Sequence, residues 1–349
     1  MNYQEPLAQA DAQKKEYLAG IEYVIRALEE DVAATRDVYV KNLFVAPQKY
    51  REELAEMIGW PLDASRPEMP PEVTEETLFE DEQVVCSRLR IRLFGEFYAS
   101  GLFFRQRAEG KHPLVVVQHG GVGSPELIAG FYDGGQTYNY NDLLSRVLAR
   151  GAHVFAPLLL IWNKETHAIP YNRELLDARL RRVGSSLAAL ELFTVMRSLD
   201  YFEKMACVGA LGMVGLSYGG FYALYTAALD TRIRATVAAS HFFSRESVPM
   251  SDRSFGNGTM PLDDAAVAAL VYPRSLTITF GKHDALFPYS AAEAEWERLK
   301  SYCAREKIHT DWINFLPFDG VHEFPTDDEA LDVLFDELST PTPKGRYES

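Results

Sequence analysis

The sequence predicts an α/β protein with a mostly parallel central sheet, helices on both faces and a helical extension at the N-terminus. From residue 84 onward, short apolar runs typical of buried strands alternate with longer segments of helical periodicity. The run 114–117 is apolar throughout, which suits a strand covered on both faces. The chain has 349 residues and is therefore long enough to bury a large core without disulfides or metals.

The first 83 residues look helical and are expected to form an extension before a main domain at 84–349. Leu18, Ile21, Ile25 and Leu28 lie on one helical face, and a second apolar group ends at residues 59–61, before a connector rich in proline and glutamate. Eight basic and 19 acidic residues give this segment a charge of −11. Two interpretations stay open, a solvated helical face that packs on the body and a role in oligomerisation or in covering a site.

The main domain begins with a strand in which Leu89, Ile91 and Leu93 alternate with arginines, and turns at Gly95 and at Ser100-Gly101 predict an antiparallel meander. Strands and helices then alternate, which predicts a parallel sheet. The expected strands are 114–117, 153–157, 213–215, 236–239, 276–280 and 313–316, and the expected helices are 141–150, 175–199, 218–229 and 291–304.

Charge and cysteine content exclude several classes of function. The net charge is −15 and there is no basic stripe, so neither nucleic acid nor an anionic membrane surface is an expected partner. Three widely spaced cysteines without a C-x-x-C pair argue against a zinc site and favour a reducing compartment. The first residues lack the apolar stretch of a signal peptide and no run is long enough to span a membrane, so we expect a cytoplasmic protein.

The strongest chemical signal is Gly215-Leu216-Ser217-Tyr218-Gly219, a G-x-S-x-G motif with a strand before it and a helix after it. In this context the turn is so tight that side chains at the two glycines would collide with the strand and helix. The serine is held in a strained conformation that exposes its hydroxyl. Ser217 is therefore the predicted nucleophile, and a plain glycine-rich turn is the alternative.

A serine hydroxyl needs a base, and in this kind of sheet the acid and the histidine follow the serine in that order. Asp284 follows the expected strand 276–280 and His322 follows 313–316, so both lie at carboxyl ends of strands. Asp284 could instead cap a turn and His322 could be a packed loop histidine. Asp319 is a second candidate for the acid, and His283 is a weaker candidate for the base.

The oxyanion of an acyl intermediate needs two N–H donors. The backbone N–H of Tyr218 is the first candidate, and Gly121 in the loop His119-Gly120-Gly121 is the second, because glycine lets the backbone approach a substrate. A flexible loop is the alternative, and a phosphate cradle is disfavoured because no G-K-[ST] follows.

With these motifs, residues 84–340 resemble the α/β-hydrolase superfamily, and within it the dienelactone-hydrolase-like and acetylxylan-esterase-like branch. The resemblance rests on His119-Gly120-Gly121, on residues 215–220, on 268–288 with Gly281-Lys282-His283-Asp284, and on Gly320-Val321-His322. Ser217 stands where dienelactone hydrolases have a cysteine, which disfavours their substrate. The resemblance implies an α/β-hydrolase fold with Ser217, Asp284 and His322 as the catalytic triad, and it favours acetyl and other short acyl groups.

The predicted function is therefore serine-dependent hydrolysis of small-molecule carboxylic esters, with no metal and no organic cofactor. His119, Gly120, Trp162 and His241 are expected to line the substrate pocket, because they follow strand ends. A peptidase or amidase with the same triad and a non-catalytic binding protein on a hydrolase scaffold remain alternatives. A homo-oligomer is left open.

Overall fold

The computed structural model describes residues 4–132, 138–160, 171–244, 247–248, 250 and 261–340. In these residues nine strands form one sheet in the order β1-β2-β3-β5-β4-β6-β7-β8-β9. The strands are β1 Val73–Glu80, β2 Val84–Phe94, β3 Phe97–Gln106, β4 His112–Gln118, β5 His153–Pro157, β6 Val208–Leu216, β7 Ile233–Ala239, β8 Ser275–Gly281 and β9 Ile313–Phe318. The first three form an antiparallel meander, and β3 is antiparallel to β5. The remaining neighbours, β5, β4, β6, β7, β8 and β9 in sheet order, are parallel to one another.

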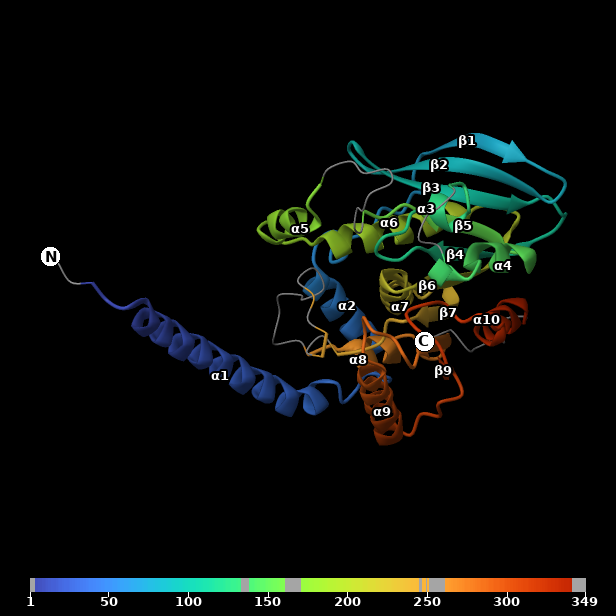
Figure 1. The fold of residues 1–349 in the computed structure, drawn as a ribbon. Helices are drawn as coiled ribbons and strands as arrows, with labels where there is room; N and C mark the ends of the chain where they lie inside the picture. Colours follow the sequence, from blue (N-terminus) through green and yellow to red (C-terminus); the bar gives the residue numbers. More distant parts are fainter. Residues whose placement is uncertain are drawn as a thin grey trace.

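Helices cover both faces of this sheet, as expected from the alternating pattern (Figure 1). The helices of the described residues are α1 Leu7–Tyr39, which projects from the body, α2 Pro47–Ile58, α3 Pro125–Ile128, α4 Leu143–Ala149, α5 Arg173–Arg181, α6 Leu187–Phe202, α7 Tyr218–Leu229, α8 Asp264–Ala269, α9 Tyr289–Glu306 and α10 Glu329–Ser339, with a 3₁₀ turn at Tyr138–Tyr140. The apolar faces of α2, α6, α7 and α8 share one buried cluster with the sheet, and those of α4 and α10 share a second cluster. No helix in the described residues is both long and apolar enough to cross a bilayer.

Three local expectations were wrong. The segment expected to be helix and connector contains β1, which pairs with β2 from Val73 opposite Ile91 to Glu80 opposite Val85. Ser100 and Gly101 lie inside β3 rather than in a turn, and a Cβ on Gly101 would come within 2.6 Å of the Phe155 ring. Glycine is therefore needed there for close packing of two strands, a requirement that the residue type alone does not distinguish from a turn.

The expected helix 175–199 is two helices, α5 and α6. The break lies at Gly184, which has a φ of +79°, and Ser186 then caps α6 by accepting a hydrogen bond from the N–H of Ala189 at 3.0 Å. The Ser186 hydroxyl also donates to the carbonyl of Ile58 at 2.8 Å. This hydrogen bond ties the segment between α5 and α6 to the C-terminal end of α2. The residue pattern alone does not reveal the break, because leucines recur at helical spacing on both sides of it.

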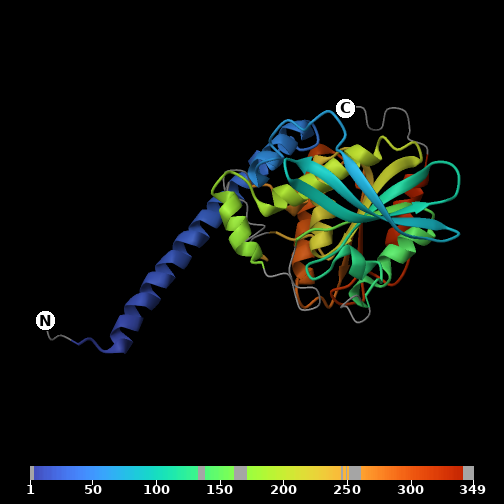
Figure 2. The same cartoon turned by 90° about the horizontal axis from the view of Figure 1, so that it is seen from above.

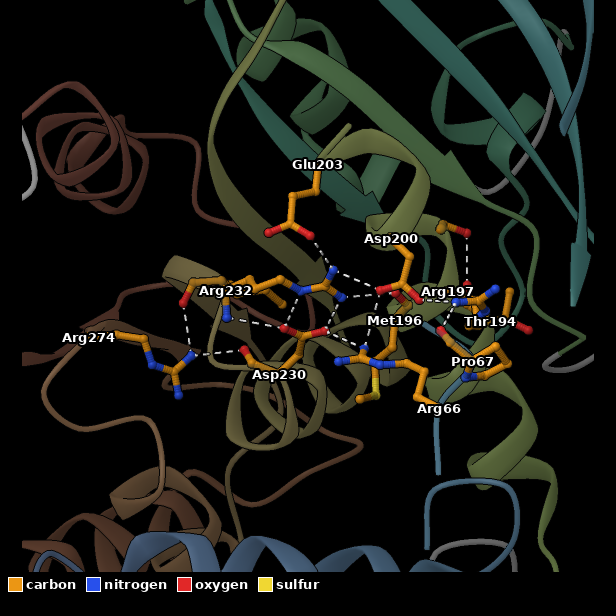
Figure 3. Close-up of polar contacts among 12 residues, drawn as sticks. Arg66, Pro67, Thr194, Met196, Arg197, Asp200, Glu203, Asp230, Arg232 and Arg274 are labelled. Atoms are coloured by element: carbon orange, nitrogen blue, oxygen red, sulfur yellow. Dashed lines mark hydrogen bonds and ion pairs between the residues drawn. The ribbon is translucent and has the colours of Figure 1, made fainter. Parts of the chain in front are cut away.

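The connector after α2 is tied to the body by a network of ion pairs (Figure 3). Asp230 accepts hydrogen bonds from Arg66 at 3.0 Å and from Arg232 at 2.6 Å, and Arg232 also contacts Asp200 at 2.8 Å. Burial by itself would raise the pKa of Asp230, but its hydrogen bonds and ion pairs with Arg232 and Arg66 lower it below the ordinary value. The buried carboxylate of Asp230 therefore holds Arg66 of the connector next to Arg232, which directly precedes β7.

Candidate active site

Ser217 lies between β6 and α7 in a conformation that non-glycine residues rarely adopt. Its φ is +62° and its ψ is −121°, and its N–H donates to the carbonyl of Ala239 on β7 at 2.8 Å. The residue is only 9% exposed. A strained backbone at a strand–helix junction is typical of functional positions, because neighbouring structure must maintain it. The predicted turn therefore has the expected geometry.

The glycines of the motif are required by close contacts. A Cβ on Gly215 would lie 2.2 Å from the carbonyl oxygen of Gly219, and a Cβ on Gly219 would lie 2.2 Å from that of Gln118. A Cβ on Gly220 would lie 2.5 Å from the carbonyl oxygen of Ala239. These distances are far below van der Waals contact, so α7 can begin this close to β4 and β7 only with glycine at these positions.

Asp284 and His322 contact each other directly. His322 Nδ1 lies 2.7 Å from Asp284 Oδ2, while Asp284 Oδ1 accepts hydrogen bonds from the N–H groups of Leu286 at 2.8 Å and Phe287 at 2.9 Å. The Asp284 side chain is fully buried, and that of His322 is 14% exposed. The carboxylate is thus held in place by its own loop, and it fixes the orientation of the imidazole.

The two competing residues pair with each other instead. His283 Nε2 lies 2.7 Å from Asp319 Oδ1, and their side chains are 67% and 88% exposed. Asp284 follows β8 and His322 follows β9, so the two loops run side by side. A Cβ on Gly281 would lie 2.0 Å from the carbonyl oxygen of Val321. Since parallel strands end at one edge of the sheet, Ser217, Asp284 and His322 all belong to that edge.

The loop after β4 lies beside Ser217. A Cβ on Gly120 would come within 3.3 Å of the Ser217 Cβ. The N–H of Gly120 donates to the Tyr140 hydroxyl at 2.6 Å, whereas the N–H of Gly121 donates to no atom in the described residues. Tyr218 is the first residue of α7 and directly follows Ser217. The two predicted donors therefore lie on the segments that adjoin the serine.

His119 does not face a pocket, contrary to expectation. It is fully buried, its Nδ1 donates to the carbonyl of Gly120 at 3.0 Å, and its Nε2 accepts from the N–H of Leu159 at 3.2 Å. Burial lowers its pKa to about 4, so the ring stays neutral. Because both nitrogens are engaged, this geometry contradicts a direct role in binding substrate. His119 instead links the loop after β4 to the segment after β5.

His241 is also enclosed, with 2% exposure. Its ring packs against Phe221 and Phe243, with centroids 5.3 and 4.7 Å away, and its Nε2 lies 3.4 Å from Asp264 Oδ2. Contacts continue from Phe243 to Phe287 at 4.7 Å and from Phe287 to His322 at 5.2 Å. His241 therefore supports an aromatic row that ends at His322, rather than lining open space. Trp162, another expected pocket residue, lies outside the described residues.

Residues 139–141 join the two halves of the site, although no sequence pattern indicates them. The carbonyl of Asn139 accepts from the N–H of Phe324 at 2.7 Å, and Asn141 Nδ2 donates to the carbonyl of Phe324 at 2.6 Å and to Glu323 Oε2 at 3.1 Å. Tyr140, between them, accepts from Gly120. Burial raises the pKa of Tyr140 to about 12, so its hydroxyl keeps its proton. One short segment thus holds both the His322 loop and the loop after β4.

A buried ion pair behind the serine was missed as well. Arg173 donates to both carboxylate oxygens of Glu191, at 3.0 and 2.9 Å, and to the Tyr222 hydroxyl at 3.1 Å. Its guanidinium lies 5.8 Å from the ring centroid of Tyr218. The pair therefore connects α5, α6 and the first turns of α7. No sequence pattern indicates it, because the partners come from three separate helices.

The described residues hold no group of three or more histidine, cysteine, aspartate or glutamate side chains arranged to bind a metal. A cavity of about 690 Å³, lined in part by Phe44, Arg51 and Trp312, does not include any of the predicted site residues.

Neither a family model nor a curated protein sequence matches the chain. Solved structures do match it. Acetyl xylan esterase 1 from Thermoanaerobacterium superposes with a TM-score of 0.56 at 16% identity, over 83% of this chain and 92% of that chain. A glucuronoyl esterase from Solibacter usitatus gives 0.60 at 13% identity, over 86% and 94%. An esterase from a marine bacterial metagenome gives 0.58 at 15% identity, over 85% and 92%. The chain has the α/β-hydrolase fold.

Proposed function

Since the chain has the α/β-hydrolase fold, we propose that it hydrolyses carboxylic esters through an acyl-enzyme on Ser217. The observation that carries this proposal is the 2.7 Å contact between His322 and Asp284, at the strand edge to which the strained Ser217 belongs. Such a serine, histidine and carboxylate set is what nucleophilic acyl transfer requires. The solved structures with the same fold are named as esterases, which supports ester rather than other acyl substrates.

In the proposed reaction, Ser217 Oγ attacks the acyl carbonyl carbon while His322 Nε2 accepts the hydroxyl proton. Asp284 stabilises the imidazolium that forms. The backbone N–H groups of Gly121 and Tyr218 donate to the oxyanion of the tetrahedral intermediate. His322 then returns the proton to the leaving alcohol. In the second half, His322 takes a proton from a water whose oxygen attacks the acyl carbon, and it then returns that proton to Ser217 Oγ as the acyl–oxygen bond breaks and the acid is released.

Short acyl esters, acetyl esters above all, are the proposed substrates. One similar structure is named an acetyl xylan esterase and another a putative acetyl xylan esterase, which favours acetyl over longer acyl groups. An amidase or peptidase would use the same residues, because the fold does not determine the leaving group. Paired nitrophenyl ester and nitroanilide substrates with the same acyl group distinguish the two activities.

The test combines a substrate series with active-site labelling. Nitrophenyl esters of increasing acyl length should be hydrolysed fastest at the acetyl end, and EDTA should leave the rate unchanged. A fluorophosphonate probe should label the wild type and Ser301→Ala, whose serine lies on the exposed side of α9, but not Ser217→Ala. A Ser217→Ala variant that is still labelled and still active would exclude Ser217 as the nucleophile.

A further inference from the structure

Helix α1 projects from the body of the molecule as a single helix (Figures 1 and 2). It has 33 residues, and only Arg36 near its C-terminal end is buried. The attachment is confined to the last turn, where Arg36 Nε lies 3.2 Å from Asp263 Oδ2 and the Tyr39 hydroxyl donates to Glu53 at 2.6 Å. An isolated helix in water gains little stability from its own hydrogen bonds, so a long helix of this kind normally packs against another element.

The exposed apolar residues of α1 follow a heptad repeat. Leu18, Ile21, Ile25 and Leu28 are spaced by three, four and three residues, and Val32 continues the pattern. The first four are 57%, 42%, 41% and 60% exposed. Tyr17 and Val24 widen the same stripe and are 75% and 53% exposed. A 3.5-residue apolar repeat is typical of helices that wrap around each other in a coiled coil.

A hollow runs along α1 next to the apolar stripe. Tyr17, Gly20, Ile21 and Val24 line a hollow along the helix, and no atom lies within 4 Å of the position of a Cβ on Gly20. The hollow lies beside the row of Leu18, Ile21, Ile25 and Leu28 and leaves room along α1 for a neighbouring element.

We propose that α1 pairs with α1 of a second copy of this chain as an antiparallel two-helix coiled coil. When the two-fold axis crosses the helix pair at the height of residue 23, Leu18 faces Leu28 of the second copy and Ile21 faces Ile25 of the second copy. The same register places Leu7 opposite Tyr39, so the helices overlap from end to end over about 50 Å. In this register Leu18, Ile21, Ile25 and Leu28 form layers that are apolar on both sides, while Val32 packs on the side chain of Lys14 of the second copy.

Charges and geometry favour the antiparallel over the parallel arrangement. In the antiparallel register Lys15 lies near Glu29 of the second copy, and symmetry repeats this pair. Glu22 approaches its own counterpart at the axis, where both side chains can turn to solvent. In a parallel pair Glu22 and Glu29 face Tyr17 and Val24, without an opposite charge. Because α1 joins the body at Tyr39, a parallel pair also crowds both bodies at one end, whereas an antiparallel pair separates them.

The interface has the size expected of a modest but specific dimer. Covering the exposed apolar stripe in two copies removes on the order of 1,000 Å² of surface, near the lower limit for stable complexes. The self-association should therefore depend on protein concentration. The proposal does not rest on the ester-hydrolysis proposal, since α1 contributes no residue to the site described above.

Sedimentation equilibrium of the full chain over a range of concentrations tests the pairing. The wild type should form a dimer, and Ile21→Glu with Ile25→Glu should be monomeric at every concentration. The matched control is Tyr23→Glu, which alters a 68% exposed side chain away from the stripe and should still dimerise. Circular dichroism verifies that the body of each variant is folded. A wild type that stays monomeric, whether or not it binds lipid vesicles, overturns the proposal, and so does an Ile21→Glu, Ile25→Glu double variant that still dimerises.

Cysteine crosslinking tests the orientation, in a background where the partly exposed Cys207 is replaced by serine. A mixture of Ile21→Cys and Ile25→Cys chains should form a disulfide-linked dimer on oxidation, because these positions face each other in the antiparallel register. Ile21→Cys alone should crosslink poorly. Efficient crosslinking of Ile21→Cys to itself, with none in the mixture beyond that, contradicts the antiparallel arrangement.

Discussion

Asp284 holds His322 with one carboxylate oxygen while its other oxygen is occupied by two backbone N–H groups of the same loop. Because each carboxylate oxygen has its own partners, the orientation of an amide side chain at this position can be predicted. In Asp284→Asn, the side-chain oxygen would stay with the N–H groups of Leu286 and Phe287, so the NH₂ group would face His322 Nδ1.

This gives the first prediction. The asparagine NH₂ group would donate to Nδ1 and leave the proton on Nε2, where the imidazole can no longer accept the proton of Ser217. The expected loss in kcat on nitrophenyl acetate is about 10⁴-fold. Asp319→Asn is the control, because Asp319 is exposed and pairs with His283; it should stay within about threefold of the wild type. The reverse ranking in folded variants would assign the acid to Asp319.

The second prediction concerns the segment that holds the loop beside Ser217. Tyr140→Phe removes the acceptor of the Gly120 N–H, which lies 2.6 Å from the hydroxyl in a buried position. An unsatisfied buried N–H costs about 1–3 kcal/mol, and we expect the free energy of unfolding to fall by that amount. Because the same loop carries Gly121, kcat should fall with little change in KM. Tyr98→Phe, whose ring stacks on Arg90 in the meander, should affect neither quantity.

The third prediction uses the contact between the two loops that carry Asp284 and His322. In Gly281→Ala, the added Cβ would lie 2.0 Å from the carbonyl oxygen of Val321, so the His322 loop must move away from β8. A displacement of about 1 Å in a catalytic group costs on the order of 10²-fold in rate. Gly209→Ala on β6 is a matched strand substitution whose Cβ meets nothing closer than 3.2 Å. Equal activity of both variants would show that the loop tolerates the shift.

The fourth prediction concerns pH and stability. The pKa of Asp230 is lowered in the folded state, so its charge stabilises the fold at pH values above the pKa of an unfolded aspartate, about 3.9. This contribution is lost as the pH falls through the lower, folded-state pKa. Asp230→Asn should therefore reduce the free energy of unfolding at pH 7 by about 3–5 kcal/mol, since it leaves Arg232 and Arg66 without their buried partner.

Urea unfolding at several pH values measures this effect. The difference between wild type and Asp230→Asn should shrink as the pH is lowered from 5 toward 3, because the wild type then loses the same charge. A gap that stays constant over this range would mean that Asp230 contributes through packing and neutral hydrogen bonds. Glu297→Gln, on the exposed side of α9, is a control that should not change the pH dependence of stability.

The sequence by itself determined the features that depend on local patterns. Strand and helix periodicity predicted the parallel half of the sheet, because each buried strand reads as an apolar run and each helix as an apolar stripe. The G-x-S-x-G motif placed Ser217 at a strand–helix turn, since only glycine allows the backbone contacts found there. Asp284 and His322 were predicted as site residues because each follows a buried strand, and sites lie at the carboxyl ends of parallel strands.

Only the tertiary structure decided between residues of similar local character. Asp284 and Asp319 both follow strands, and their sequence context does not reveal that one is buried against His322 while the other is exposed beside His283. Likewise, Gly95 and Gly101 look alike in sequence, although one lies at a turn with a φ of +52° and the other lies inside β3 against Phe155. Contacts such as Tyr140 with Gly120 join segments 20 residues apart through a single hydroxyl. No periodicity encodes such contacts, because they depend on how separate elements pack together.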